Sequence, residues 1–567
     1  MNVKNSFLHS IVCFTVILFI SGCGGGSSNS VSKKPSIVGN IQDKAVWYEK
    51  NPKSLATIQV TVPVPNDYRC RPFDDLTAPE RPCTFIDVYH DTNPYDDYKP
   101  KLHVIMTSDD YGISAQASMV QKGRSTRQAK QKGFRITLDK QYPLYNDERT
   151  LQLNKHPYDH SRMRNRLFFS IFESVPNFTS LRTRFAHLYM DQEDNGTFVD
   201  KGLFTHVEHY DGLFLQNHGF GLSDNLYKAK NFSFQIVPGM EVDAKDKPLN
   251  KKAFDQIIEM ENGKDRKKLL EMVQAVENTP ASNFMNVFNK YFNRENYLTW
   301  MAVNIITGNK DTVNQNFYLL NPKYSDTFYF LPWDYDGAAY TYPIDIKWDF
   351  GLGRYWEIPL HKKFLLDKKN REDLAKKINF LRTNYFNDTI IHEKVDKYKP
   401  IVEPFIKVLP DSHYLNYTDW VNDTAYLRNQ AIPYNLQRYQ EELGTPMPFW
   451  QSVSYKNQNL SIIWDESIDL ENDIVDYNLT VAKDMNMSQV VIQEHGLSKE
   501  SPLITYISDS KALNYQKTIS LQPGTYYLKI VSYERNNPKH YQIAFDKDLV
   551  FKYENSRYGG ILEFRVE

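Results

Sequence analysis

Residues 308–336 read GNKDTVNQNFYLLNPKYSDTFYFLPWDYD, and this stretch carries the strongest signal in the chain. FYLL and TFYFL are short runs of strand-forming residues, and the turn-forming segment NPKYSD joins them. Such a hairpin carries the chain out and back, so we expect Asp334 and Asp336 to return beside Asn316. Asp311 precedes Asn316 by five residues in the same loop. The stretch therefore predicts a cluster of carboxylate and amide side chains at the end of a hairpin.

Such a cluster contains the side chains that phosphoryl transfer requires. One Asp can orient and deprotonate an acceptor hydroxyl, and Asn and Asp oxygens suit Mg²⁺ bound to the phosphates. Protein kinases place an Asp and an Asn five residues apart and follow them with a hairpin and a metal-binding Asp. Asp and Asn are also common turn formers, so the spacing alone leaves a purely structural loop as the alternative.

The flanking segments predict a mixed α+β chain. Alternating β-branched residues from about 57 to 138 indicate a sheet, and helical periodicity follows around 161–174, with Asp159 as its N-cap. Residues 250–308 and 360–445 are predicted to be mostly helical.

The character of the chain changes after Pro446. The segments LSIIWDESID, DYNLTVAKD, KTISLQPG and TYYLKIVSYE alternate like strands of a small sandwich. Trp464, Tyr477 and LQPGTYY (521–527) resemble the fibronectin type III pattern, in which a Tyr hydroxyl bonds back to the backbone. Residues 447–567 are therefore predicted to form an all-β sandwich of the immunoglobulin or fibronectin III type.

Further motifs, in the expected order, resemble the CotH kinase family (spore coat protein H), a group of atypical secreted or surface protein kinases. The resemblance extends from about residue 101 to 440 and adds several motifs to GNKDTVNQN and PWDYD. These are QKGRSTRQAKQKGFRITL (121–138), LQLNKHPYDHSRMRNRL (151–167) with Asp159, Ser161, Arg164 and Asn165 in place, GLFTHVEHYDGLFL (202–215) and LYKA (226–229).

The resemblance implies a role for each matched residue. Asp311 would be the catalytic carboxylate, Asn316 and Asp334 the metal ligands, and Asp336 a further metal ligand. The nucleotide-binding residues implied are Lys132 as the phosphate-binding lysine, Lys130 as its alternative, Arg124, Glu208 and Lys228. The family's Lys-Lys doublet is interrupted here by Gln131, and its Arg-Gly-x-Ser-Ser segment also departs from the pattern.

The resemblance also implies a fold and an activity. A two-lobed, protein-kinase-like domain is expected over residues 41–446, with an N-lobe at about 57–215 and a C-lobe at about 216–446. The implied reaction transfers the γ-phosphoryl group of ATP, with Mg²⁺ or Mn²⁺, to Ser or Thr of surface or extracellular proteins.

The N-terminus predicts export. An apolar run from Ile11 to Ile20 is too short to cross a bilayer and is followed by ISGC, which resembles a bacterial lipobox with Cys23 as the lipidated residue. Residues 1–23 are thus a predicted signal peptide and 24–40 a flexible linker, placing a membrane lipoprotein at the periplasm or cell surface. Cys70 and Cys83, which remain in the mature chain, are most simply one disulfide in an oxidising compartment.

Composition excludes several classes of protein. Hydrophobic residues make up 41% of the chain and charged residues 24%, which excludes intrinsic disorder and a polytopic membrane protein. Lys and Arg number 68 against 69 Asp and Glu, so no electrostatic footprint for nucleic acid is expected.

Two other functions remain open on the residues alone. HPYDH and HVEH bring His156, His160, His206, Glu208 and His209 into short segments from which a zinc site could be built, although HExxH is absent. A non-catalytic adhesin or glycan-binding scaffold on a kinase-like fold is the second alternative. Its sugar-stacking candidates are Tyr340, Tyr342, Trp348, Tyr355 and Trp356.

Overall fold

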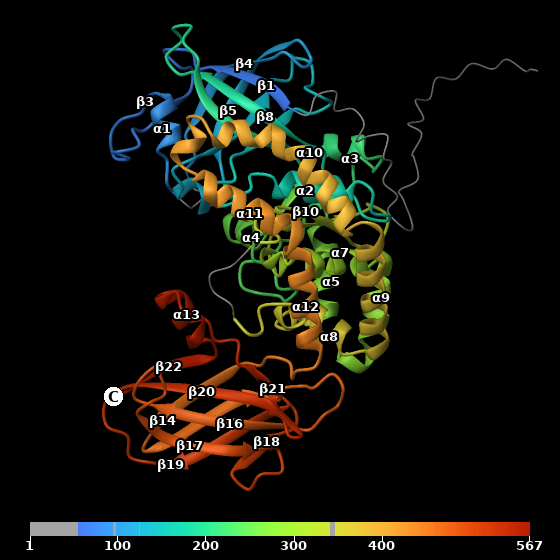
Figure 1. Ribbon diagram of the computed structural model, residues 1–567, viewed down its shortest axis with the longest axis vertical. Coiled ribbons are helices and arrows are strands. Elements are labelled where there is room, and N and C mark those ends of the chain that lie inside the picture. Colours follow the sequence, from blue (N-terminus) through green and yellow to red (C-terminus); the bar gives the residue numbers. More distant parts are fainter. Residues whose placement is uncertain (1–54, 94–97, 124, 341–345) are drawn as a thin grey trace, which may run out of the picture. The chain divides into compact units, whose positions relative to one another are not determined.

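The computed structural model describes residues 55–93, 98–123, 125–340 and 346–567. Helices and strands are both abundant in these residues, so the predicted α+β class is confirmed (Figure 1). The predicted signal peptide, Cys23 and the linker lie outside the described residues, as do Arg124 and Tyr342.

A closed barrel forms the N-terminal part, drawn in blue to green in Figure 1. Its order is β1-β4-β5-β6-β7-β9-β8, and a parallel pairing of β1 with β8 closes it, so these strands leave no free sheet edge. The alternating sequences that predicted strands also fill the interior: β4 alternates half-buried and buried positions along its length. The barrel strands are β1 (Leu55–Thr61), β4 (Lys101–Ser108), β5 (Ile113–Lys122), β6 (Gly133–Leu138), β7 (Thr150–Asn154), β8 (Thr183–Asp191) and β9 (Val199–Val207).

The short elements around the barrel are tied to it by a disulfide and a capping box. Cys70 and Cys83 form the predicted disulfide, which links the small β2–β3 ribbon next to the barrel core. Thr84 and Asp87 cap the first helix reciprocally. These elements are β2 (Arg69–Cys70), β3 (Arg81–Pro82), α1 (Phe85–Tyr89) and η2 (Ser125–Gln128).

A second sheet and a set of helices follow the barrel. The sheet has the order β11-β10-β12-β13, and β12 and β13 are the hairpin that the sequence predicted. Its strands are β10 (Asn225–Ala229), β11 (Ile258–Asn262), β12 (Phe317–Asn321) and β13 (Tyr329–Pro332). The helices are α2 (Arg164–Phe172), α3 (Gly212–Asn217), α4 (Lys251–Ile257), α5 (Arg266–Asn278), α6 (Phe284–Tyr291), α7 (Arg294–Thr307), α8 (Pro359–Leu365), α9 (Lys368–Asn384), α10 (Asp388–Ile406), α11 (Tyr417–Asn429) and α12 (Ala431–Leu443), with short η3 (Ala281–Asn283), η4 (Lys310–Thr312), η5 (Gly353–Tyr355) and η6 (Asp411–His413).

The structure corrects two of the predicted segments. Residues 258–262 were expected to be helical, but they form strand β11, whose pairing with β10 outweighs the helical pattern of the sequence. The helix predicted over 161–174 begins only at Arg164, because Asp159 accepts hydrogen bonds from the backbone of Ser161 and Arg164 and holds the intervening chain as a turn.

The C-terminal residues form two further sheets, drawn in orange and red in Figure 1. Their orders are β14-β15-β19-β18 and β17-β16-β20-β21, with β22 paired to β20. Trp464 is buried between them, and the Tyr526 hydroxyl donates to the carbonyl of Gln522 at 2.9 Å, a bond of the kind that the sequence predicted. The elements are β14 (Gln451–Lys456), β15 (Asn459–Asp465), β16 (Val475–Ala482), β17 (Val490–Leu497), β18 (Ile504–Ile507), β19 (Ala512–Thr518), β20 (Gly524–Glu534), β21 (Asn537–Ile543), α13 (Asp548–Tyr553), η7 (Ser556–Tyr558) and β22 (Ile561–Val566).

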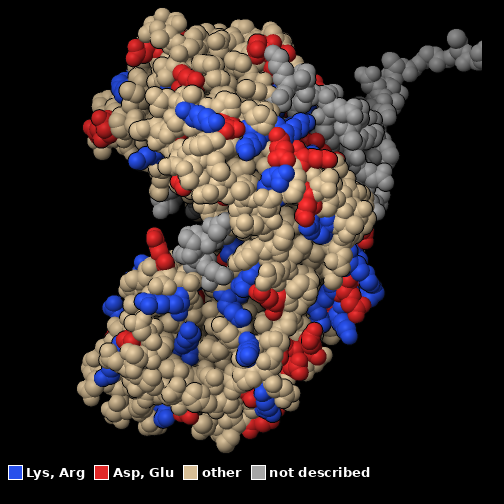
Figure 2. All heavy atoms as spheres, in the orientation of Figure 1, with Lys and Arg blue, Asp and Glu red and all other residues tan. Residues whose placement is uncertain are grey.

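Charges of both signs are mixed on the face shown in Figure 2, in keeping with the balanced composition. In the part of the chain that the structure describes, every helix is too short or too polar to cross a bilayer.

Acid is expected to destabilise the helical core through His361 on α8. This side chain is fully buried, and its Nδ1 lies 2.7 Å from the Tyr297 hydroxyl. Burial lowers the pKa of His361 to about 3, so the unfolded chain binds a proton below about pH 6.5 that the folded chain does not. The free energy of unfolding should therefore fall by about 2 kcal/mol from this group alone between pH 6.5 and 4.5.

Urea unfolding of wild type and His361→Phe at the two pH values measures this effect. The variant should lose about 2 kcal/mol less than wild type over the same pH interval. Identical pH dependence of the two proteins would contradict a neutral, buried His361.

Candidate active site

The candidate catalytic loop follows helix α7. That helix ends with Gly308 in the left-handed conformation (φ 58°), which turns the chain into η4 and places Asp311 there. Phe317 then pairs with Pro332 across the β12–β13 hairpin, so Asn316, just before Phe317, and Asp334, two residues after Pro332, lie at the same end of the sheet. Both adopt positive φ angles, 55° and 58°, which are uncommon for residues other than Gly. The register of the hairpin thus places Asn316 beside the segment that carries Asp334, as the sequence predicted.

Asp334 and Asp336 influence each other's ionisation. Burial and the charge of Asp336 raise the pKa of Asp334 to about 7, with Asp311 adding to the rise and Lys122 and His156 opposing it. The pKa of Asp336 is lowered instead: burial opposes its ionisation, but His156 and a hydrogen bond from Asp334 outweigh that cost. The two neighbouring carboxyls therefore differ in proton affinity, with Asp336 ionising more readily than Asp334.

His156 and Asn165 hold the Asp336 segment in place. The imidazole Nδ1 lies 3.0 Å from Asp336 Oδ2, and Nε2 lies 3.2 Å from Asn165 Nδ2. Asn165 Oδ1 accepts the backbone N–H of Tyr335 at 2.7 Å. His156, one of the zinc-ligand candidates in the sequence, therefore orients the Asp336 carboxylate.

Arg164 anchors the next turn of the same loop. Its Nε donates to the carbonyl of Ala338 at 2.9 Å, and Nη2 donates to that of Ala339 at 3.1 Å. The fully buried guanidinium also bonds Asp159 at 2.5 Å and Asp423 at 2.5 and 2.7 Å. The Arg164 and Asn165 side chains of the motif Asp-x-Ser-x-x-Arg-Asn thus hold the backbone that follows Asp334.

Loss of Arg164 is expected to destabilise the fold strongly. Arg164→Met leaves the Asp159 carboxylate buried without its partner, which should cost about 3–5 kcal/mol of unfolding free energy. Arg428→Met is the matched control, because Arg428 forms a two-contact pair with Asp396 at the surface, and its loss should cost less than about 1 kcal/mol. Urea unfolding measures both, and equal losses would contradict the anchoring role.

Two lysines approach the carboxyl pair from different sheets. Lys122 ends strand β5 at the barrel rim, and its Nζ donates to Asn154 Oδ1 at the end of β7. Lys228 lies on β10, in register with Tyr318 of β12. The Lys122 and Lys228 ammonium groups lie 5.0 and 5.5 Å from the ring centroid of Trp333, which immediately precedes Asp334. The barrel thus contributes Lys122 and the second sheet contributes Lys228 to the surroundings of Trp333.

The electrostatics of these lysines reflect their crowding. Burial lowers the pKa of Lys122 to about 7, and the charges of Lys228 and Arg135 add to this against the raising effect of Asp334 and Asp336. Burial likewise lowers the pKa of Lys228. Burial and the same three cations lower the pKa of His209 to about 3, so its imidazole is neutral near pH 7. The amines of Lys122 and Lys228 and the guanidinium of Arg135 lie in a partly desolvated site, which suits an anion such as a chain of phosphates.

Lys132 and Lys130 occupy other surroundings. Lys132 Nζ donates to the backbone carbonyl of Arg127, and burial lowers its pKa against the opposing charge of Asp91. Lys130 is exposed, and its carbonyl accepts the Tyr89 hydroxyl at 3.0 Å. Lys122 of the same segment, residues 121–138, instead acts on Asp334 through its charge.

Glu208 belongs to a separate buried network. Its carboxylate accepts from Arg182 Nε at 2.9 Å and lies 2.9 Å from His218 Nε2. Although burial opposes ionisation, His218 and Arg182 lower the pKa of Glu208 to about 2. Glu208, which the family resemblance implied as a nucleotide-binding residue, is therefore bonded to Arg182 and His218 in the structure.

Asp311 is an exposed residue of η4 whose charge acts on Asp334. Loss of surrounding water raises its pKa, Arg354 opposes the rise and Asp336 adds to it. The neighbouring Lys310 is held away by Asp349 at 2.9 Å. An accessible carboxylate with a raised pKa is a suitable proton acceptor for an incoming hydroxyl.

The donor atoms of this cluster fit a hard divalent cation. Asp334 and Asp336 lie near enough for each to shift the pKa of the other, and Asn316, which carries an amide oxygen, lies at the same end of the hairpin. Among the described residues, the histidines considered for zinc do not form a compact group of three or more ligands. His206 instead lies 3.3 Å from Glu148, and His209 lies 2.7 Å from Gln152 Nε2.

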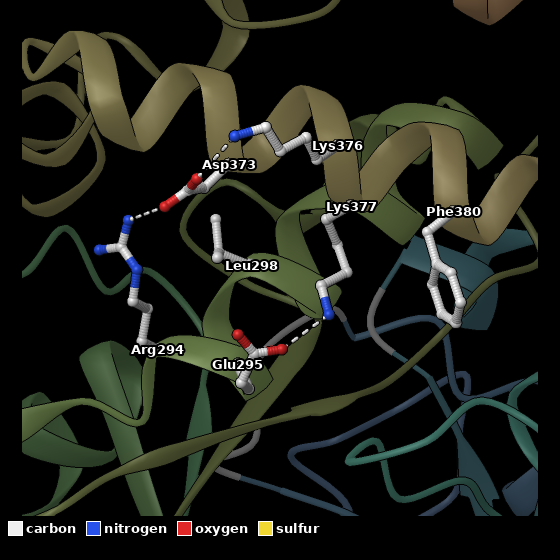
Figure 3. Close-up of a pocket in the computed structure, with 7 residues that line it drawn as sticks. All are labelled: Arg294, Glu295, Leu298, Asp373, Lys376, Lys377 and Phe380. Atoms are coloured by element: carbon white, nitrogen blue, oxygen red, sulfur yellow. Dashed lines mark hydrogen bonds and ion pairs between the residues drawn. The ribbon is translucent and has the colours of Figure 1, made fainter.

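Two other features do not provide a binding site. Trp348, Tyr355 and Trp356, which were predicted to stack on sugar, are each 2% exposed and belong to the core, so their rings are not available to a glycan. Figure 3 shows a pocket between α7 and α9 in which the charged side chains pair with one another. The Arg294–Asp373 and Lys377–Glu295 distances are 2.9 and 2.8 Å. This pocket contains none of the candidate residues.

Several residues of the cluster were not predicted from the sequence. Lys122, Asn154, Trp333 and Arg135 come together only when β5, β6, β7 and β13 are placed in space. The position of Lys122 at the end of a strand, directly before Gly123, was the one local signal available.

Comparison with known proteins agrees with the motifs. Residues 119–443, more than half of the chain, match the family model described as CotH kinase protein, and the match includes every residue of the lysine and carboxylate cluster. Inner spore coat protein H of Bacillus subtilis (strain 168) is 23% identical over 220 residues, which are 38% of this chain and 57% of that protein. The matched region thus spans little more than half of that relative's length. The predicted resemblance is confirmed.

Proposed function

Because the chain belongs to the CotH kinase protein family, we propose that it transfers the γ-phosphoryl group of ATP to Ser or Thr hydroxyls of surface or extracellular proteins. The observation that carries the proposal is the meeting of Lys122 and Lys228 with the Asp334–Asp336 pair around Trp333. Cations for phosphate oxygens and carboxylates for a divalent ion are here adjacent, which is the arrangement that phosphoryl transfer needs.

Each residue has a role in this proposal. Asp311 accepts the proton of the acceptor hydroxyl, for which its solvent-facing position and raised pKa are suited. Lys122 and Lys228 bind phosphate oxygens, and the Trp333 ring supports both ammonium groups. His156 orients Asp336, and Arg164 fixes the loop behind it.

Asn316, Asp334 and Asp336 would hold Mg²⁺ or Mn²⁺. The ion would neutralise charge on the phosphates as it develops during transfer. Burial and the charge of Asp336 raise the proton affinity of Asp334, so the protein itself supports binding of positive charge at this position.

The remaining parts of the chain suit a protein held at a surface. We propose that residues 1–23 direct export, that Cys23 carries the lipid anchor, and that 24–40 form a tether. Residues 41–446 would be the kinase-like domain, with lobes meeting near residue 216. The sheet orders β14-β15-β19-β18 and β17-β16-β20-β21 and the Tyr526 bond support a fibronectin III-like module over 447–567.

The test is transfer of label from γ-labelled ATP by purified residues 31–567, with Mg²⁺, with Mn²⁺ and with a chelator. Metal-dependent label on the protein or on a generic acceptor protein is the expected result. Metal-dependent nucleotide binding without transfer would overturn the catalytic part of the proposal. Absence of both binding and transfer would favour the non-catalytic surface scaffold.

A further inference from the structure

A second acidic cluster lies in the C-terminal sheets, apart from the candidate active site. Asp469 and Asp473 belong to the connection between β15 and β16, and Glu534 ends strand β20. One oxygen from each of the three carboxylates lies within 4.8 Å of the others. In the described residues this is the one group of three or more acidic, His or Cys side chains with such spacing.

One carboxylate oxygen of Asp469 has no hydrogen-bond partner among the described residues. Its Oδ1 accepts the backbone N–H groups of Glu471 and Asp473 at 2.8 and 3.0 Å. Its Oδ2 is buried and has no hydrogen-bond partner among the described residues, and the residue as a whole is only 6% exposed. A buried carboxylate oxygen without a partner is costly, so it indicates that a ligand completes the site.

The nearby basic side chains do not fill this gap. His540 Nδ1 lies 2.9 and 3.0 Å from the two oxygens of Glu534, so this ring nitrogen is directed at Glu534 and not at Asp469. Burial lowers the pKa of Arg371 of α9 and the charge of Asp469 opposes this, but the Arg371 Nη2 donates to the carbonyl of Leu470 at 2.8 Å. Three carboxylates therefore converge with no cation bonded to the Asp469 oxygen that remains.

We propose that Asp469, Asp473 and Glu534 bind a hard divalent cation, with Ca²⁺ as the preferred ion. Carboxylate oxygens on a loop suit the flexible, oxygen-rich coordination of Ca²⁺ better than the N- and S-rich coordination of Zn²⁺. The ion joins the 469–473 loop to strand β20 and stabilises the C-terminal sheets. The site is independent of phosphoryl transfer, because none of its residues belongs to the Asp334 cluster.

The test is thermal unfolding and calorimetric titration of the full chain with CaCl₂, carried out in Asp334→Asn protein so that the candidate catalytic metal site is weakened. We expect a dissociation constant of about 0.1–1 mM, as for extracellular calcium modules, and a rise in Tm of about 5 °C at saturation. Wild type should show at least the same rise, because the C-terminal site is separate from the catalytic one and remains intact in both proteins.

Asp469→Asn is the decisive variant. It is isosteric and keeps one oxygen to accept the two backbone N–H groups, while its amide can donate to Glu534. It should unfold at the same or a higher temperature than the parent in chelator, yet lose the calcium response, with affinity reduced at least about 10-fold. A merely damaged fold would lower the Tm in chelator instead.

Asp509→Asn, in an exposed turn of the same sheets, is the matched control and should keep the full calcium response. An equal calcium response in Asp469→Asn and its parent would overturn the proposal, and so would no response in either protein. A response to Zn²⁺ without one to Ca²⁺ would overturn the assignment to a hard cation.

Discussion

Asp334→Asn is expected to reduce phosphoryl transfer at least about 10³-fold while leaving the protein folded. The substitution keeps the size of the side chain, but it removes the carboxylate on which Asp336, Lys122 and Asp311 all act. Two effects combine: a charged ligand for the divalent ion is lost, and the lysines lose a counter-charge. Transfer of γ-label and metal-dependent nucleotide binding should both fall.

Asp311→Asn separates binding from chemistry in the same assay. Asp311 lies at the solvent-facing side of the cluster, so its loss should remove turnover and preserve metal-dependent nucleotide binding. Asp326→Asn is the matched control, because Asp326 is an exposed acid in the turn between β12 and β13. Unchanged transfer by purified Asp334→Asn or Asp311→Asn protein would refute the catalytic assignment.

Lys122→Met is expected to raise the Michaelis constant for ATP and lower turnover, with a combined loss in kcat/KM of about 10²–10³-fold. Met keeps the length of the side chain, and removal of a buried charge beside Lys228 and Arg135 relieves repulsion, so the fold should persist. Steady-state kinetics and a direct nucleotide-binding titration measure the change.

Lys132→Met provides the opposing test. Its ammonium group bonds the carbonyl of Arg127, so its loss should affect the stability of the barrel rim more than nucleotide binding. A large loss of activity in Lys132→Met with none in Lys122→Met would return the phosphate-binding role to the residue first implied by the family motif. A large loss of activity in both variants would indicate that Lys122 and Lys132 belong to one site.

The hairpin around the carboxylates was predictable because its signals are local. Strand-forming runs and the NPKYSD turn determine the β12–β13 pairing, and a pairing register of Phe317 with Pro332 leaves Asn316 beside Asp334. The helices from α8 to α12 were likewise expected from their periodicity. Strand β11 was not, because its formation depends on an edge that β10 offers only after folding.

The choice between lysines could not be made from spacing. Lys122, Lys130 and Lys132 lie within one segment, and the turn after β5 sends their side chains to different surroundings. The barrel closure by β1 and β8 also lacked a local signal, since the paired strands are far apart in the chain.

The sequence by itself determined the α+β class, the hairpin, the order of the carboxylates and amide along the chain, and the family, because these depend on short-range patterns. The tertiary structure alone decided that Lys122 joins Lys228 at Trp333, that Arg164 and His156 support the Asp334 loop, and that Glu208 pairs with Arg182. The physical reason is that burial and charge depend on neighbours from distant segments. A pKa raised or lowered by those neighbours has no counterpart in the linear pattern of residues.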